Sequence, residues 1–270
     1  MSDILEVKNI SVAFDGFKAI NNLSFSIGAR EMRAIIGPNG AGKTTFMDII
    51  TGKTKPDSGD VIWGERNISL LRKSESQIAQ LGVGRKFQKP TVFENKTVED
   101  NLMISLSNRR TFFFALTYDY NEQEKMRVAE IAELVNLDVS HDKKAGDLSH
   151  GQKQWLEIGM LLAQDPMLLL IDEPAAGMTS SERLSTVKLL KDMAKTRSVI
   201  VVEHDMDFVR NLNCGVTVLH EGSVLAEGHL DHISKNKDDH YDEDKNNPTT
   251  STKNEKESKL KILYNKYDIF

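Results

Sequence analysis

The chain has 270 residues, of which 39% are hydrophobic and 28% charged, and its net charge of −5 argues against a general nucleic-acid binder. Its single cysteine, Cys214, excludes an intramolecular disulfide framework and a multi-cysteine metal site, and we expect it to be an ordinary thiol. No stretch approaches the roughly 20 apolar residues of a membrane span, and the first residues lack a secretion signal, so an intracellular protein is expected.

Two strand-like runs open the chain, at 5–14 and 19–27, and Asp15-Gly16 supplies the turn between them. Phe14 ends the first run. An aromatic ring in this place is able to fold back and stack on an adenine, whereas a core phenylalanine of a strand is the alternative. The sequence leaves both interpretations of Phe14 open.

The segment 37–45 matches the pattern G-x-x-x-x-G-K-[ST] of a phosphate-binding P-loop. Its glycines let backbone N–H groups turn toward a phosphate chain, while Lys43 adds positive charge and the Thr44 hydroxyl is placed to hold Mg²⁺. An apolar strand at 32–36 precedes the loop and a helix follows from Thr45, which is the context the motif requires. The residues expected to bind the nucleotide are Gly37, Pro38, Asn39, Gly40, Ala41, Gly42, Lys43, Thr44 and Thr45.

After a strand predicted at 61–64, residues 81–90 indicate another strand that runs into a loop. Gln88 in this loop has the chemistry to ligate Mg²⁺ or to orient a water molecule. For a single glutamine, the ordinary interpretation is a surface loop residue.

From Thr97 to about Ala163 the pattern predicts helices. Thr97 and Asp100 form a capping-box-like start. The run 122–137 is predicted to be amphipathic, with its apolar positions at Met126, Ala129, Leu134 and Leu137. The apolar run 112–116 follows two arginines and fits the core of a small helical subdomain better than a membrane-contacting surface.

Residues 148–152, Leu-Ser-His-Gly-Gln, open the next predicted helix, with Ser149 and Gly151 in its first turn. A helix N-terminus with small residues at its entry is a second place where an anion binds. Most such helices bind nothing, so this segment alone is weak evidence for an anion-binding site.

The run 167–171 is fully apolar and ends in two carboxylates, Asp172 and Glu173. Two carboxylates at the end of a buried strand are costly without a metal or a partner, so a functional interpretation is favoured. Asp172 is expected to hold the Mg²⁺ shell beside the P-loop, and Glu173 to polarise an attacking water. The next strand, 198–202, ends before His204, which we expect to touch the γ-phosphate.

A hairpin is predicted at 216–226, with its turn at Glu221-Gly222. The composition then changes, because 231–270 contains no Gly, Ala, Val or Met and is rich in charged and polar residues. Such a segment cannot bury enough apolar surface to order itself, so a disordered tail is expected.

In this order, the motifs resemble those of the nucleotide-binding subunits of ABC transporters, over about residues 4–230. The resemblance implies an α/β fold: a P-loop NTPase core with a mixed sheet and helices on both faces, an antiparallel N-terminal β region and an inserted helical subdomain at about 89–163, within a domain that spans 1–230. It assigns 37–45 to the Walker A loop and 167–172 to the Walker B strand. The single residues it assigns are Gln88 as the Q-loop glutamine, Glu173 as the catalytic glutamate, His204 as the switch histidine and Phe14 as the adenine-stacking aromatic.

The same resemblance implies an ATPase that uses ATP and Mg²⁺, with Thr44, Gln88 and Asp172 around the metal. A second ABC ATPase subunit, with a heterodimer favoured, is expected to cap the ATP with the signature residues Ser149, His150, Gly151 and Gln152. The other implied partners are membrane permease subunits, docked near Gln88 and Phe93, and indirectly a solute-binding protein, with no nucleic acid. The expected location is the cytoplasmic face of the cell membrane, reached through the permease.

Within the family, the residues at 84–93, 148–160 and 201–210 resemble the ATPases of urea uptake systems, which belong to the branched-chain amino-acid transporter group. Urea is therefore the expected cargo, and branched-chain amino acids are the alternative. A soluble ABC protein acting on ribosomes or DNA is a weaker rival, since such relatives carry two cassettes or a long coiled coil. Two positions depart from the family pattern: His150 replaces a glycine, and Thr179 stands where many relatives carry an aspartate.

Overall fold

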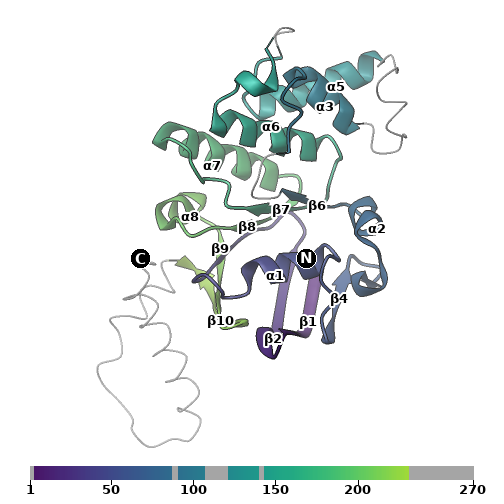
Figure 1. Cartoon of the computed structure of the whole chain (residues 1–270), viewed down its shortest axis with the longest axis vertical. Helices are drawn as coiled ribbons and strands as arrows, with labels where there is room; N and C mark the ends of the chain where they lie inside the picture. The colour runs from purple at the N-terminus through teal and green to yellow at the C-terminus, as the bar shows by residue number, and fades with distance from the viewer. Residues whose placement is uncertain (1–2, 87–90, 107–120, 140–142, 231–270) are drawn as a thin grey trace, which may run out of the picture.

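Two β-sheets organise the part of the chain that the computed structural model describes, residues 3–86, 91–106, 121–139 and 143–230 (Figure 1). The first sheet is antiparallel and has the order β2-β1-β4-β5. It contains the predicted N-terminal pair, which turns at Asp15-Gly16 as expected. The bounds are β1 Asp3–Phe14, β2 Phe17–Gly28, β4 Ser58–Trp63 and β5 Ile68–Ser69.

The second sheet has the order β10-β9-β3-β8-β7-β6 and is parallel apart from the antiparallel edge strand β10. Every residue of β7 and β8 is buried, which explains why both strands read as unbroken apolar runs. Because β3, β8 and β7 pair in parallel, their carboxyl ends lie side by side, and this edge is the usual place for a ligand in such a sheet. The bounds are β3 Met32–Ile36, β6 Val83–Lys86, β7 Leu168–Asp172, β8 Ser198–Val202, β9 Gly215–His220 and β10 Ser223–His229.

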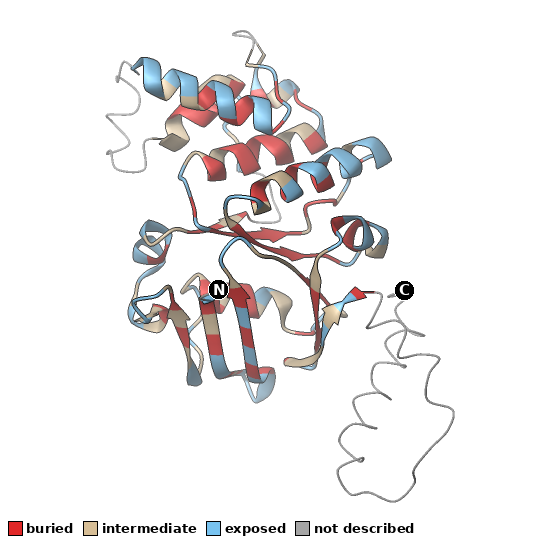
Figure 2. Cartoon of the chain, turned by 180° about the vertical axis from the view of Figure 1, so that it is seen from behind, coloured by how far each residue is buried: buried red, intermediate tan, exposed pale blue. Residues whose placement is uncertain are grey.

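The central strands divide their side chains between two cores, one on each face of the sheet. Leu170 and Ile200 pack with helix α1 (Lys43–Ile50) and the N-terminal sheet, whereas Ile171 and Val201 pack with helices on the other face. This alternation follows from the two-residue period of a strand. Figure 2 shows the central strands as a buried layer between the two halves of the molecule.

Helices cover the face opposite α1, with α6 and α7 above the sheet and α3 and α5 beyond them (Figure 1). The predicted capping box is confirmed, because the Asp100 backbone N–H donates to Thr97 Oγ1 at 3.0 Å and Thr97 N–H donates to Asp100 Oδ2 at 3.3 Å. The helix bounds are α2 Glu75–Gln80, α3 Val98–Leu106, α5 Glu122–Leu134, α6 His150–Leu162, α7 Ser180–Ala194 and α8 Met206–Leu212, with 3₁₀ turns at Leu70–Arg72 and Ala145–Asp147.

The predicted apolar face of α5 is wrong. Met126 is 64% exposed and Leu134 42% exposed, and Ala129 is also exposed, although Leu137 just beyond the helix is buried. The buried positions are Val128, Ile131, Ala132 and Val135, a second set at helical spacing that packs toward α6. The helix also ends at Leu134, three residues before the predicted end.

Three predictions fall outside the described residues: those on Gln88, on the apolar run 112–116 and on the tail 231–270. Within the described ranges, none of the helices has the length and apolar character that crossing a membrane requires.

Candidate functional site

The P-loop lies between β3 and α1, beneath the carboxyl ends of the central strands. Gly42 ends the loop with a φ of 98°, and a Cβ there would lie 2.7 Å from the Ala19 carbonyl oxygen. A Cβ on Gly37 would lie 2.2 Å from the Leu219 carbonyl oxygen. No side chain caps α1 at Gly42, so its first-turn N–H groups are available to an anion. The backbone here is shaped for phosphate.

Lys43, the first residue of α1, donates from Nζ to the carbonyl oxygens of Gly37 and Pro38, at 2.6 and 3.0 Å. Burial lowers the pKa of Lys43, and the carboxylates of Glu173 and Asp172 oppose that shift. The lysine and both carboxylates thus share one electrostatic site.

A cavity of about 360 Å³ brings the P-loop and the end of β7 together. The β1–β2 hairpin, the P-loop and the carboxylates at the end of β7, which are far apart in the sequence, all line this cavity. The lining residues are Phe14, Phe17, Ala19, Asn39, Gly40, Gly42, Lys43, Thr44, Thr45, Asp172, Glu173 and Val202.

Two phenylalanines stand at the mouth of this cavity. Phe14 is 49% exposed and Phe17 is 65% exposed, and they face each other across the β1–β2 hairpin. The core interpretation of Phe14 is therefore wrong, since a core phenylalanine would be buried. Phe17 was not among the predicted site residues, although an aromatic ring directly after the Asp15-Gly16 turn was an available signal.

Removing either ring is expected to weaken ATP binding. Stacking of a base on an aromatic side chain contributes about 1–3 kcal/mol, so Phe14→Ala and Phe17→Ala should each reduce ATP affinity by about 5- to 150-fold. Titration of a fluorescent ATP analogue measures the change. Phe93→Ala is the matched control, because Phe93 is similarly exposed but does not line the cavity. Unchanged affinity in both variants would remove the rings from the adenine site.

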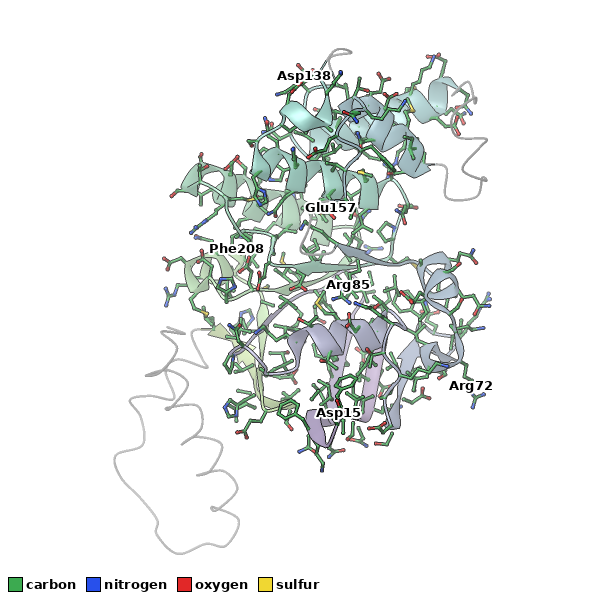
Figure 3. All side chains as sticks on the ribbon, viewed as in Figure 1. Asp15, Arg72, Arg85, Asp138, Glu157 and Phe208 are labelled. Carbon is green, nitrogen blue, oxygen red and sulfur yellow. The ribbon has the colours of Figure 1, made fainter. Side chains whose placement is uncertain are left out.

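Asp172 is buried at the end of β7, and its carboxylate lies 3.9 Å from Arg85 Nη2. Burial raises the pKa of Asp172, while Arg85 opposes the rise. Arg85, which was not among the predicted site residues, also pairs with Asp48 on α1 and so joins α1 to the end of β7; Figure 3 shows it beside α1. The Arg85 guanidinium thus fixes the positions of the Asp48 and Asp172 carboxylates relative to each other.

The residues present fit a magnesium ion. Mg²⁺ usually takes one or two protein ligands and completes its shell with phosphates and water. Thr44 and Asp172 supply one hydroxyl and one carboxylate to the same cavity. Among the described residues no group of three or more His, Cys, Asp or Glu side chains is placed to hold a metal by itself.

Glu173 turns out of the strand with a φ of 47°, a rare conformation for a residue with a side chain. Its backbone N–H donates to the Val202 carbonyl oxygen at 2.9 Å, which fixes the turn against β8. Its Oε1 lies 3.5 Å from Nδ1 of His204. The structure thus brings the predicted base and the predicted switch histidine together at the cavity edge.

The signature residues lie elsewhere. Ser149 caps α6 in a capping box with Gln152, and its Oγ donates to Glu182 Oε1 at 3.0 Å. A Cβ on Gly151 would lie 2.6 Å from the same carboxylate. Of the described residues that line the P-loop cavity, none belongs to 149–152. A single subunit therefore presents the P-loop and the signature as separate surfaces.

Thr179, where many relatives carry an aspartate, caps α7. Its Oγ1 donates to Glu182 Oε2 at 2.8 Å and accepts from the Glu182 N–H. The position thus has a clear role inside the subunit, because serine, threonine and aspartate all serve as helix N-caps.

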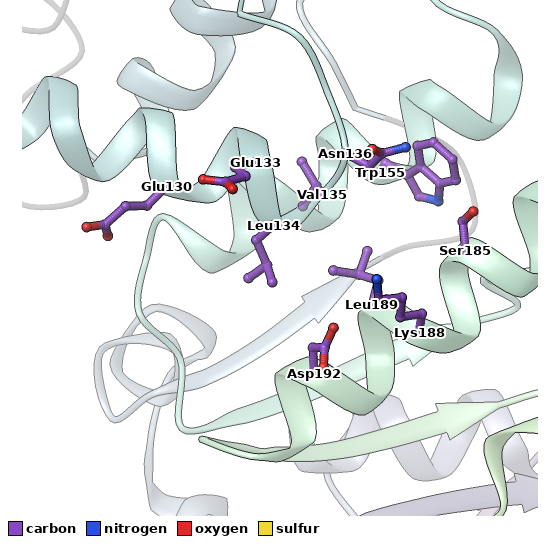
Figure 4. Close-up of a pocket in the computed structure, with 10 residues that line it drawn as sticks. All are labelled: Glu130, Glu133, Leu134, Val135, Asn136, Trp155, Ser185, Lys188, Leu189 and Asp192. Atoms are coloured by element: carbon purple, nitrogen blue, oxygen red, sulfur yellow. The ribbon is translucent and has the colours of Figure 1, made fainter.

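A larger cavity of about 490 Å³ lies between the end of α5 and α7, away from the P-loop (Figure 4). Trp155 lines it and donates from Nε1 to Thr186 Oγ1 at 2.8 Å. Carboxylates of Glu130, Glu133 and Asp192 surround it with Lys188, and it has no phosphate-binding loop. This cavity is unsuited to a nucleotide.

Cys214 is also remote from the P-loop cavity, and burial raises the pKa of its thiol to about 11.

Comparison with known proteins identifies the family of this chain. The ABC transporter family model matches residues 20–176. The probable branched-chain amino acid transport ATP-binding protein LivG of Methanocaldococcus jannaschii is 33% identical over 242 residues, which cover 87% of this chain and 93% of that protein.

Solved structures give the same result. The crystal structure of the ADP conformation of an ATP-binding cassette from an ABC transporter is 30% identical, with a TM-score of 0.76 and coverage of 88% of this chain and 96% of that one. A dimeric post-hydrolysis cassette bound to ADP and Pi is 25% identical, with a TM-score of 0.70 and coverage of 84% and 98%. The predicted P-loop NTPase fold is confirmed, and the chain belongs to the ABC transporter family as its ATP-binding cassette, an ATPase coupled to transport.

Proposed function

We propose that this chain powers the import of branched-chain amino acids. The observation that carries the cargo is the relative from Methanocaldococcus jannaschii, whose name assigns it to branched-chain amino acid transport and which this chain matches over nearly its whole length. The cassette itself does not touch cargo, so relatedness across the full cassette is the available guide. This cargo replaces urea as the leading hypothesis.

In the proposed cycle, two cassettes close head to tail, as ABC cassettes do. ATP held by the P-loop of one subunit is capped by Ser149, His150, Gly151 and Gln152 of the other. The support is that these four residues lie away from the P-loop cavity of their own subunit, so each subunit offers two half-sites.

Within a closed site, Lys43 and the P-loop N–H groups hold the β- and γ-phosphates. Glu173 accepts a proton from the attacking water, and His204 steadies the γ-phosphate and the Glu173 side chain. Thr44, Asp172 and Gln88 would hold Mg²⁺, which when bound neutralises charge on the phosphates. Hydrolysis then reopens the pair.

We place the permease on the helical region, at about 89–163 of an ABC domain that spans 1–230. Phe93 is exposed there and lies shortly after Gln88 in the sequence, so closure of the ATP site would move the permease from this point. The cassette then sits at the cytoplasmic face of the membrane, held by the permease, paired preferably with a different ATPase subunit and served by a solute-binding protein.

Urea is the second candidate cargo. The residues at 84–93, 148–160 and 201–210, including His150, resemble the ATPases of urea uptake systems. These ranges flank the predicted Q-loop, signature and switch histidine, so they bear on the type of transporter.

Uptake measurements in a strain that lacks this gene test the proposal. Complementation with the wild-type chain is expected to restore uptake of labelled leucine, and complementation with Lys43→Ala is expected not to. Restored urea uptake without leucine uptake would transfer the proposal to the second candidate. If neither returns and the chain co-purifies with ribosomes in place of a permease, the transport proposal is wrong.

A further inference from the structure

The segment 174–179, which links Glu173 to α7, is held from two sides by buried polar side chains. Gln154 of α6 contacts it on one side and Glu203, at the end of β8, on the other. Both side chains are almost completely buried. Polar groups are costly to bury unless their hydrogen bonds are well used, so the two contacts call for a specific explanation.

On the α6 side, Gln154 Nε2 donates to the Ala176 carbonyl oxygen at 2.9 Å and lies 3.0 Å from His150 Nε2. The His150 ring packs directly on the segment, since a Cβ at Gly177 would lie 3.0 Å from His150 Cδ2. Gly177 has a φ of 69°, so both space and backbone favour glycine there. The signature residue that departs from the family pattern is therefore in contact with the segment.

On the β8 side, the Glu203 carboxylate accepts three backbone N–H groups. Ala175 donates to Oε1 at 2.9 Å, while His204 and Asp205 donate to Oε2 at 2.9 and 3.3 Å. Burial raises the pKa of Glu203, and these three bonds oppose the rise. One carboxylate thus binds the 174–179 backbone to the backbone of the switch histidine.

The two contacts are joined through the covalent backbone of Ala175 and Ala176. Hydrogen bonds link the His150 ring to Gln154 and Gln154 to the Ala176 carbonyl oxygen, and on the other side Glu203 links the Ala175 N–H to the His204 N–H. One end belongs to the signature, and the other end lies 3.5 Å from Glu173.

We propose that Gln154 and Glu203 are positioning residues that couple the two ATP sites of the dimer. The inference rests on the proposed function, in which the signature of a subunit caps the partner's ATP while its own Glu173 and His204 serve its own ATP. Seating of His150 on the partner's nucleotide shifts the 174–179 backbone and thereby sets the position of His204. A site that lacks its neighbour's nucleotide is then held in a slow geometry.

A double-mutant cycle tests this coupling. The variants are Gln154→Met, which keeps the size of the side chain but removes its donor, Glu203→Gln, and the double variant. The assay is steady-state ATP hydrolysis by the complex with permease. Each single variant is expected to lower kcat by about 2- to 30-fold with KM for ATP within about twofold, and the double variant to lower it no further than the worse single one. The Hill coefficient for ATP should decrease toward 1 together with the fall in kcat.

Independent structural roles would give a different result. In that case the fold-decreases in kcat of the two single variants multiply in the double variant, or kcat of the variants stays at the wild-type value. Either outcome overturns the proposed coupling. Gln80→Met, at an exposed position at the end of α2 and outside the proposed nucleotide and permease surfaces, is the control. If Glu203→Gln does not fold, Glu203→Asp, which keeps the charge and shortens the reach, takes its place. A wild-type complex with no ATPase activity would instead contradict the proposed function itself.

Discussion

Glu173→Gln is expected to leave ATP bound and dimers closed while hydrolysis falls by about 10²- to 10⁴-fold, the usual contribution of a general base. Glutamine keeps the size of the side chain but cannot accept a proton at neutral pH. The turn at Glu173 does not depend on the carboxylate, because the bond from its N–H to Val202 is made by the backbone. The lost function is therefore the chemical step alone.

Phosphate release measures the rate, and size-exclusion chromatography with ATP measures the closed dimer. Glu133→Gln, a surface change on α5, is the matched control and should behave as wild type. Hydrolysis within tenfold of wild type would mean that another group takes the proton. The neighbouring His204, 3.5 Å away, would then be the first residue to examine.

Lys86→Met is expected to destabilise the fold by about 3–5 kcal/mol, the range for breaking a buried ion pair from one side. Lys86 ends β6, and its Nζ lies 3.4 Å from Glu157 Oε2 on α6; both side chains are buried, and Figure 3 shows Glu157 above the sheet. Thr91 Oγ1 donates to the other carboxylate oxygen at 3.3 Å. Without the lysine, this buried carboxylate keeps, among the described residues, hydrogen bonds from Thr91 and no opposite charge beside it.

Acidic pH should reduce the loss of stability that Lys86→Met causes. Burial raises the pKa of Glu157 above its ordinary value of 4.5, and Lys86 opposes the rise, so removal of Lys86 moves that pKa further upward. A raised folded-state pKa favours folding below the unfolded value and costs stability as pH rises through the folded value. The difference between variant and wild type is therefore smallest below pH 4.5 and grows above it.

Urea unfolding at several pH values measures the difference. Lys125→Met, on an exposed lysine that pairs with Glu122, should change stability by less than about 1 kcal/mol. The double variant Lys86→Met with Glu157→Leu should recover most of the loss, because two apolar side chains replace a buried pair well. A loss of the same size at every pH would show that packing around Lys86, and not the charge, is what matters.

The elements that the sequence predicted well are those with one dominant signal. Strands β7 and β8 are buried on both faces and read as apolar runs, and the P-loop is a local motif whose glycines are needed by its own backbone. The face of α5 failed because two sets of apolar residues share helical spacing, and only packing on α6 selects one. Helix α7 was missed because its polar first turn hides its apolar positions.

Site residues divide in the same way. Lys43, Asp172, Glu173 and His204 follow strands or lie in motifs, so the sequence alone could single them out as candidates. Arg85, Glu203 and Gln154 act through partners that are distant in sequence: Asp48, Ala175 and Ala176 respectively. The periodicity of a single sequence does not predict such pairs, because they form only when the fold brings α1, β8 and α6 to the same edge of the sheet.

The separation of P-loop and signature within a subunit has a consequence for genetics. In a dimer of two copies of this chain, an allele damaged at Lys43 still supplies a sound signature, and an allele damaged at Ser149 still supplies a sound P-loop. Mixed dimers of the two would keep one complete site, whereas either allele alone keeps none. Two recessive defects in a single gene would thus complement each other in part, and they would map to two separate surfaces of the same protein.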